Sequence, residues 1–213
     1  MPDLLPLFVN LAGRRVVLVG GGPVAAGKLV QLVAAGADVV VVSPDVHPDI
    51  EQSGVRIVRR RFAADDLDEA WLVVAAAPPE VNRAVAAAAG TRRIFVNAVD
   101  DPANATAFLS GVVRRDGVTL AISTSGEAPG LTALLREALD AILPRDLTEW
   151  MGVARRQRAA WKADRVPMTE RRPLLLRALN QLYGQQAPRG SEVGPVLSEP
   201  PRESDAVREE QVR

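Results

Sequence analysis

The first hundred residues alternate between short apolar runs and longer segments whose apolar residues recur with helical spacing. Residues 24–35 and 78–89 are of the second kind, and Gly36 follows the first of them as a helix stop. The apolar runs, each short enough for one buried strand, are Val16–Val19, Val39–Val42, Val55–Val58, Trp71–Ala76 and Ile94–Asn97. This alternation predicts βαβ units, and so an α/β fold with a Rossmann-type parallel sheet.

After Asp100 the pattern changes. Apolar runs broken by the Asp116-Gly117 turn signal predict a small sheet element with a hairpin, and residues 131–143 predict a helix that ends before Pro144. Residues 145–186 have a helical composition that is interrupted around Pro167, and residues 187–213 are rich in Pro, Gly, Ser and Glu, as in disordered tails. We therefore divide the chain into a Rossmann domain (1–110), a small mixed segment (111–145), a helical C-terminal domain (146–186) and a disordered tail (187–213).

Composition narrows the classes of function. Of the 213 residues 47% are hydrophobic but only 4% aromatic, so Ala, Val and Leu build the core. Lys plus Arg and Asp plus Glu number 26 each, which gives no reason to expect a nucleic-acid or membrane partner. The chain has no cysteine and one histidine, which excludes a thiol nucleophile and leaves no recognisable metal site. No apolar run approaches the ~20 residues that span a bilayer, so we expect a cytoplasmic protein.

The segment "GGGPVA", Gly20 to Ala25, fits the G-x-G-x-x-G/A pattern of dinucleotide-binding loops. In that pattern Gly20 permits a tight turn, Gly22 lets the backbone approach a pyrophosphate, and a small residue at position 25 packs the helix on the strand. The alternative is an ordinary glycine-rich turn. A strand before the loop and a helix after it favour binding of a dinucleotide.

Two further strand ends are candidates for contact with this cofactor. Ser43, Pro44 and Asp45 follow the second strand, where an acidic residue binds ribose hydroxyls in dinucleotide folds. Asp45 lies slightly beyond the usual position, so Ser43 and the backbone are alternative ribose ligands. No arginine adjoins these residues in the sequence, which favours NAD over NADP. Ala76 ends the fourth strand, either against the cofactor or as a plain strand end.

Polar residues also leave the fifth strand, at the edge where ligands bind in doubly wound sheets. Asn97, Asp100 and Asp101 are therefore expected near the nicotinamide end of a bound cofactor. Two adjacent carboxylates repel each other, so one of them can serve as a general base near neutral pH. In the alternative interpretation Asp101-Pro102 is a turn and both acids are solvated.

Candidate contacts to a substrate lie further along the chain. Ser123, Thr124 and Ser125 precede the helix at residue 131, where hydroxyls can cap the helix and an anion can bind. Capping alone is an equally good interpretation. Arg114, Arg115 and Arg136 can meet carboxylates of an acidic substrate, or they can simply be solvated.

Three stretches of the chain together resemble the precorrin-2 dehydrogenase (siroheme synthase N-terminal domain-like) family. They are "LPLFVNLAGRRVVLVGGGPVAAGK", "VNRAVAAAAGTRRIFVNAVDDPANATAF" and "LAISTSGEAPGLTALLREAL", and the similarity extends more weakly to about residue 186. The resemblance implies oxidation of precorrin-2 to sirohydrochlorin with NAD, on the way to siroheme or cobalamin. It further implies a homodimer formed through the segment after the Rossmann unit, with a helical C-terminal part that helps to enclose the tetrapyrrole.

The resemblance also implies roles for particular residues. The aspartate of its "NxVD" motif, the proposed catalytic group, is Asp100 here. Pro23 and Val24, like Pro44 and Asp45, fall where the family contacts NAD, and Thr124 aligns with a serine that some members phosphorylate. Some members also insert iron into sirohydrochlorin. Three alternatives to a protein that acts as a dehydrogenase alone stay open: additional chelatase activity in the same site, a dedicated chelatase without a cofactor, and an NAD-sensing module without catalysis.

Overall fold

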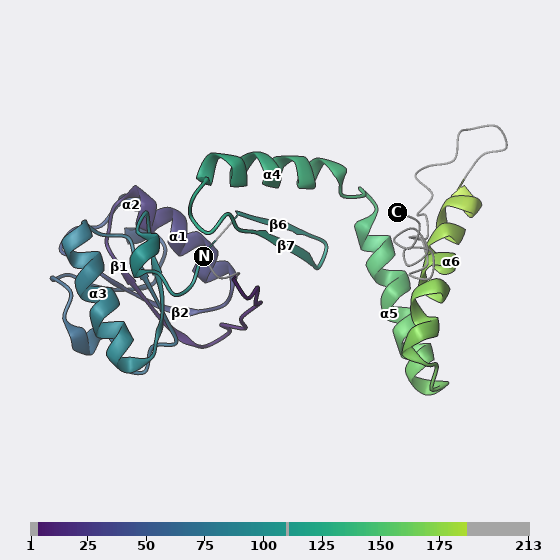
Figure 1. Cartoon of the computed structure of the whole chain (residues 1–213), viewed down its shortest axis with the longest axis horizontal. Helices are drawn as coiled ribbons and strands as arrows, with labels where there is room; N and C mark the ends of the chain where they lie inside the picture. The colour runs from purple at the N-terminus through teal and green to yellow at the C-terminus, as the bar shows by residue number, and fades with distance from the viewer. Residues whose placement is uncertain (1–3, 110, 187–213) are drawn as a thin grey trace, which may run out of the picture. The chain divides into compact units, whose positions relative to one another are not determined.

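The structure is a computed structural model that describes residues 4–109 and 111–186. Its first part is a five-stranded parallel sheet with the strand order β3-β2-β1-β4-β5 (Figure 1). The strands are β1 (Arg15–Val19), β2 (Asp38–Val42), β3 (Arg56–Val58), β4 (Leu72–Ala75) and β5 (Phe95–Ala98). All five strands expected from the sequence are present, within one or two residues of the predicted bounds.

Helices connect the strands by the crossovers that a parallel sheet requires. α1 (Pro23–Ala34) and α3 (Pro79–Arg92) correspond to the two predicted helices, and Gly36 adopts a φ of 73° just after the first. Three short elements were not predicted: α2 (Pro48–Glu51), η1 (Ala64–Leu67) and η2 (Pro102–Asn104). None of them is long enough to show a helical period of apolar residues.

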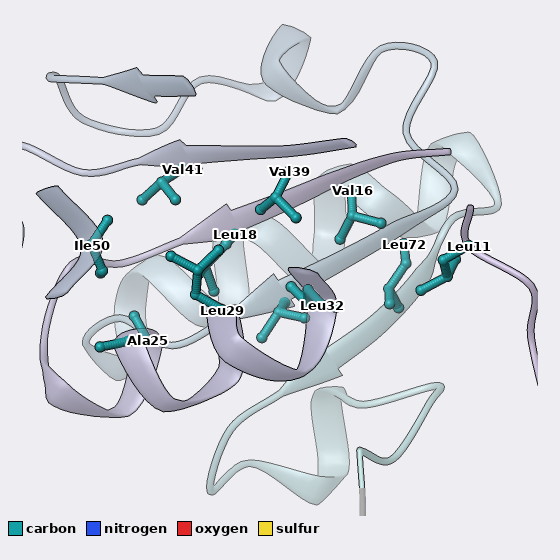
Figure 2. Packing of buried hydrophobic residues seen from close by; sticks show 12 residues of the cluster. Leu11, Val16, Leu18, Ala25, Leu29, Leu32, Val39, Val41, Ile50 and Leu72 are labelled. Atoms are coloured by element: carbon teal, nitrogen blue, oxygen red, sulfur yellow. The ribbon is translucent and has the colours of Figure 1, made fainter. Parts of the chain in front are cut away.

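The sheet is buried on both faces, which explains why its strands read as continuous apolar runs. On one face Val16, Leu18 and Val41 pack against α1, and Figure 2 shows Leu18 pointing toward Leu29 and Leu32 of that helix. The other face carries a second cluster of buried residues, from strands β1, β2, β4 and β5 and from α3. Each buried valine or leucine of these clusters contributes about 1.5–3 kcal/mol by leaving water.

The rest of the described chain is a two-stranded sheet and three helices. β6 (Gly111–Arg115) and β7 (Val118–Ile122) form the predicted hairpin, and both of its turn residues, Asp116 and Gly117, have positive φ as a two-residue turn needs. The helices are α4 (Pro129–Ile142), α5 (Leu147–Ala163) and α6 (Met168–Gln186). The predicted interruption around Pro167 falls between α5 and α6.

Contacts divide the chain into two compact units. Among the described residues, the first unit comprises 4–109, 111–113 and 120–141, and the second comprises 114–119 and 142–186. The domain boundaries that the sequence predicts at residues 110, 145 and 186 stay predictions. The tail expected at 187–213 lies outside the described residues. Over residues 4–109 and 111–186, no helix is both long and apolar enough to cross a bilayer.

The second unit has a small core of its own between α5 and α6. Trp161 and Leu179 are buried there. The indole nitrogen of Trp150 donates a hydrogen bond to the Tyr183 hydroxyl at 2.7 Å, and the two rings meet edge to face. Burial raises the pKa of the Tyr183 hydroxyl, so the phenol stays protonated through the neutral range.

Candidate functional site

The carboxyl ends of the strands bring most of the predicted cofactor residues to one edge of the sheet. The register aligns Val19 of β1 with Ala75 of β4, and Ala75 with Ala98 of β5. The next residues continue the ladder: the Ala76 amide donates to the Val19 carbonyl at 2.8 Å, and the Val99 amide to the Ala75 carbonyl at 2.9 Å. The glycine loop and the residues after β4 and β5 therefore start side by side.

Two of the three loop glycines are required by close packing. Gly20 has a φ of 120°, and a Cβ added to it would lie 2.1 Å from the Ala76 carbonyl oxygen. A Cβ on Gly21 would lie 1.8 Å from the carbonyl oxygen of Asp45. The sequence pattern leaves the second position of the motif open, so it did not reveal the demand for glycine at position 21. Glycine is required there because the loop after β2 folds back over Gly21.

Gly22 and the start of α1 are open by contrast. A Cβ on Gly22 would meet nothing within 4 Å. Gly22 caps α1 without any side-chain hydrogen bond, Pro23 begins the helix, and the first turn has no acidic residue. The first-turn amides and the positive end of the helix dipole therefore lie next to an uncrowded glycine with no acidic side chain in the first turn, which suits a pyrophosphate. Val24 is 51% exposed beside this opening, at a position where the resemblance implies contact with NAD.

The loop after β2 presents an acidic side chain at the same edge. Ser43 is buried, and its hydroxyl donates to the Asp45 carbonyl at 2.6 Å, which fixes the turn. The amide of His47 donates to the Gly21 carbonyl at 2.6 Å and ties the turn to the glycine loop. Pro44 and Asp45 are exposed. Of the two candidate ribose ligands, Asp45 is thus the one exposed to solvent, whereas the buried Ser43 stabilises the turn.

Tertiary structure also brings arginines to the end of β2 that are not adjacent in sequence. β3 lies beside β2, the Ser43 amide donates to the Val58 carbonyl at 3.2 Å, and Arg59, Arg60 and Arg61 follow directly. Arg59 pairs with Glu51 of α2. Arg60 donates two hydrogen bonds to the carboxylate of Asp66, at 2.8 and 2.5 Å, and this contact lowers the Asp66 pKa. Two of the three guanidinium groups are therefore engaged by acids.

Asn97 and the two adjacent aspartates have different surroundings. Asn97 is 6% exposed and donates to the Ala107 carbonyl at 3.0 Å, while its side-chain oxygen is buried with no hydrogen-bond partner in the described chain. The Asp101 carboxylate accepts a bond from the side-chain amide of Asn104 at 2.8 Å, and the Asp101 carbonyl accepts one from the Asn104 backbone amide at 3.2 Å, so Asp101 begins the η2 turn. Asp100 is exposed and holds a left-handed φ of 56°. A strained backbone at such a position is typical of functional sites.

The loop from Ser123 to Pro129 packs against the segment that follows Asp100. A Cβ on Gly126 would lie 3.1 Å from the Pro102 ring and 3.7 Å from Phe108. The Thr124 hydroxyl accepts from the Ala128 amide at 3.3 Å and lies 2.9 Å from the Thr132 hydroxyl. Thr124 therefore caps the start of α4, which is the capping interpretation of this loop. In addition, Ser123 accepts a bond from the Ser125 amide within the loop.

The three predicted substrate arginines belong to different units. Arg136 lies on α4 in the first unit and bonds Glu137 at 3.4 Å. Arg114 and Arg115 belong to the second unit, where Arg115 donates to the Leu143 carbonyl at 3.1 Å. Their role in substrate binding stays a prediction. Across the described ranges, no three His, Asp or Glu side chains gather as a metal site would require.

Sequence reasoning missed Lys28. Its ammonium group donates to the Leu109 carbonyl at 3.4 Å, and burial lowers its pKa while the charge of Asp100 acts to raise it. Lys28 is half-buried on a helix whose inner face holds Ala25, Leu29 and Leu32. The sequence feature that could have singled out Lys28 is a lysine next to the apolar face of this helix.

Comparisons with known proteins agree with this geometry. Residues 7–111 match the family model described as "Putative NAD(P)-binding". The chain is 39% identical over 194 residues to Siroheme synthase 3 of Aeromonas hydrophila, covering 88% of this chain and 42% of the relative. It is 42% identical over 148 residues to Siroheme synthase of Tolumonas auensis, covering 68% and 32%. The chain thus spans less than half the length of these curated relatives.

A solved structure supports the fold. "SirC, precorrin-2 dehydrogenase" superimposes with a TM-score of 0.64 at 23% sequence identity, over 86% of this chain and 93% of that one. This likeness confirms the predicted architecture: a Rossmann-type sheet, then a small second sheet, then a helical C-terminal region. At that identity it carries the fold alone.

Proposed function

The chain belongs to the precorrin-2 dehydrogenase and siroheme synthase N-terminal domain-like family, and from this premise we propose that it oxidises precorrin-2 to sirohydrochlorin in the cytoplasm with NAD as oxidant. The substrate loses two hydrogens, one as a hydride and one as a proton. NAD supplies the hydride acceptor when it is bound. The observation that carries the proposal is that the open turn at Gly22 and the exposed Asp100 follow strands that end at the same edge of the sheet.

The residues at this edge fit a dinucleotide. Backbone amides at the start of α1 would bind the pyrophosphate, with Pro23 and Val24 beside it. Asp45 would accept hydrogen bonds from ribose hydroxyls, and the unpartnered oxygen of Asn97 would accept one from the carboxamide of the nicotinamide. The exposed carboxylate of Asp45 would repel a 2′-phosphate, and Arg59 and Arg60 are held by acids. This pattern supports NAD over NADP.

Asp100 is the proposed general base. Its exposed carboxylate follows β5, and it would take the proton that leaves the tetrapyrrole as the hydride departs. The remaining work of the protein is orientation of a large polycarboxylate over the nicotinamide. Arg136 and the Ser123–Ser125 loop are the candidates for that contact within the first unit.

The direct test mixes the full chain with precorrin-2 and NAD and follows the absorbance of NADH. Asp100→Asn should lower the rate by about 10²- to 10⁴-fold, the range for loss of a general base, with NAD affinity nearly unchanged. Asp38→Asn is the matched control, because Asp38 is exposed at the opposite, amino edge of the sheet. An Asp100→Asn variant as fast as the control would remove Asp100 from the mechanism.

The same assay separates the alternative functions. NAD binding without any turnover would indicate an NAD-sensing module. Insertion of Fe²⁺ or Co²⁺ into sirohydrochlorin without NAD would indicate a dedicated chelatase. Metal insertion in addition to NADH formation would indicate both activities. A lower dissociation constant for NADP than for NAD would contradict the assignment of the cofactor.

We also propose a homodimer in which α4 supplies the contact. No residue of α4 is buried in the described chain, and Leu131, Leu134 and Ile142 are at least half exposed. Apolar side chains spaced along one helix at this exposure favour burial against another surface. Leu134→Glu should shift the protein from dimer to monomer in analytical ultracentrifugation while the sheet stays folded. A wild-type chain that sediments as a monomer at micromolar concentration would contradict this proposal.

A further inference from the structure

A buried asparagine on α3 is bonded to the turn that follows β4. Asn82 is 4% exposed, on a helix face that otherwise buries Val85 and Ala89. Its side-chain oxygen accepts a hydrogen bond from the backbone amide of Ala77 at 3.0 Å. A polar side chain is costly to bury unless it is hydrogen-bonded. The bond to Ala77 therefore accounts for an asparagine among apolar residues, and it connects α3 to the carboxyl edge of the sheet.

The Ala77 amide lies at the point where the pairing of β4 with β5 ends. The Val99 amide donates to the Ala75 carbonyl at 2.9 Å. In a regular parallel ladder the Ala77 amide would then donate back to the Val99 carbonyl. It donates to the side chain of Asn82 instead. Asn82 thus ends the ladder on the β4 side, at the edge of the sheet where the proposed cofactor residues gather.

The same turn packs directly against the glycine loop. The Ala76 carbonyl oxygen lies so close to Gly20 that a Cβ on this glycine would be 2.1 Å from it. Ala76 packs with the apolar cluster on the α1 face of the sheet, and Ala77 packs with the cluster on the opposite face. Pro78 and Pro79 follow, and neither has an amide hydrogen. The Ala77 amide is therefore the last donor of the turn, and its bond to α3 fixes the chain that contacts Gly20.

We propose that Asn82 is a positioning residue for the dinucleotide: by accepting the Ala77 amide, it holds the turn after β4 against Gly20 in the shape that the pyrophosphate loop requires. This inference rests on the proposed function for the identity of the ligand, but the bond itself does not. Asn82 is buried on α3, so it acts only through the turn. Loss of its oxygen leaves the Ala77 amide without a partner, and the turn then gives up the conformation that supports Gly20.

The binding test compares Asn82→Leu with Asn82→Asp in the full chain. Leucine keeps the branched shape of the side chain but offers no acceptor. Asn82→Leu should therefore raise the dissociation constant of NAD by about tenfold in calorimetry, the range for one buried hydrogen bond. Asn82→Asp keeps an oxygen acceptor near the start of α3, where the helix dipole favours a negative charge. Its dissociation constant should stay close to that of the wild type.

Val85→Ala is the matched control. Val85 lies one helical turn after Asn82 on the same face of α3 and is fully buried, but its apolar side chain makes no hydrogen bond to the turn. Val85→Ala should lower the midpoint of thermal unfolding, because it leaves a cavity, and should not change the affinity for NAD. If it weakens NAD binding as much as Asn82→Leu does, the loss comes from a looser α3 and the positioning role is overturned.

Hydrogen exchange followed by NMR tests the bond directly and begins with the wild-type chain, which needs no variant to fold. The Ala77 amide should exchange slowly although it lies in a turn, and its resonance should move when NAD is added. In Asn82→Leu the exchange of this amide should be at least about tenfold faster, while the amide of Ala86 in the middle of α3 keeps its rate. A wild-type Ala77 amide that exchanges freely, or whose resonance ignores NAD, would overturn the inference.

The outcomes separate this inference from the proposed function. An Asn82→Leu variant that loses protection at Ala77 but binds NAD as the wild type does would overturn the positioning role and leave the proposed reaction intact. An Asn82→Asp variant as weak as Asn82→Leu would also overturn that role, because the acceptor would then not matter. A wild-type chain that binds NAD through this loop but forms no NADH from precorrin-2 would keep the positioning role and overturn the proposed reaction.

Discussion

Strand β1 and helix α4 are both rich in apolar residues, yet the chain covers only one of them. Residues 16–19 of β1 are buried on both faces of the sheet, with exposures of 0–2%. α4 has a clear apolar side, but no residue of it is buried in the described chain, and Leu134 is 64% exposed. An apolar pattern therefore predicts that a surface will be covered, but it does not identify what covers it.

The largest expected effect comes from the same substitution, leucine to alanine, made once in each region. Leu18→Ala should lower the free energy of unfolding by about 2–5 kcal/mol, because it leaves a cavity between the sheet and α1. Leu134→Ala should change it by less than about 0.5 kcal/mol in the dilute monomer. Chemical denaturation followed by circular dichroism measures both. Equal losses at low protein concentration would show that α4 packs within its own chain.

A second pair repeats the comparison inside the glycine loop. Gly21→Ala forces a methyl group onto the Asp45 carbonyl and should destabilise the protein by about 1–3 kcal/mol. Gly22→Ala meets open space, so stability should stay nearly constant. The new methyl group should instead weaken NAD binding by about tenfold, equal to about 1.4 kcal/mol. Calorimetry with NAD and thermal unfolding check both statements, and an unaffected dissociation constant for Gly22→Ala would move the pyrophosphate elsewhere.

The α5–α6 pair provides a smaller test of whether the second unit has independent stability. Tyr183→Phe leaves the Trp150 indole N–H without its acceptor and should cost about 1 kcal/mol. Hydrogen exchange should become faster in α5 and α6, while the amides of β1 and β4 keep their protection. Faster exchange in the sheet as well would show that the two units unfold together.

The smallest effect is a pH dependence at the edge of the sheet. Hydrogen bonds from Arg60 lower the pKa of Asp66 in the folded state, so the unfolded chain binds the proton first as the pH falls. The stabilisation from Asp66 is therefore present above the normal aspartate pKa, about 3.9, and is lost as the pH falls through the lower folded value. Asp66→Asn should flatten this acid limb of the stability curve.

Most of the fold was predictable because each feature depends on local sequence. The valine runs of β1, β2 and β4 mark strands with two buried faces, and the Asp116-Gly117 pair marks the hairpin. The short elements α2, η1 and η2 were missed because three or four residues cannot display a helical period. The bounds of the longer elements differ from the prediction by only a few residues.

The candidate site was predictable in part. The edge that holds Gly20, Gly22, Ala76, Asn97 and Asp100 follows from strand order and parallel register, which the βαβ rhythm already implies. The need for glycine at position 21, the arginines after β3 and the contact of Lys28 with the Leu109 carbonyl did not follow. Arg114 and Arg115 were grouped with Arg136, but the structure assigns them to different units.

The sequence by itself determined the parallel sheet, the glycine loop and the edge at which the polar residues gather, because each of these depends on periods and turns within a few neighbouring residues. Only the tertiary structure decided that the Asp45 carbonyl packs on Gly21, that Arg60 bonds Asp66, and that Lys28 reaches the Leu109 carbonyl. Contacts of this kind join segments on different crossovers. They depend on how helices and loops pack on the sheet, and no local period records that packing.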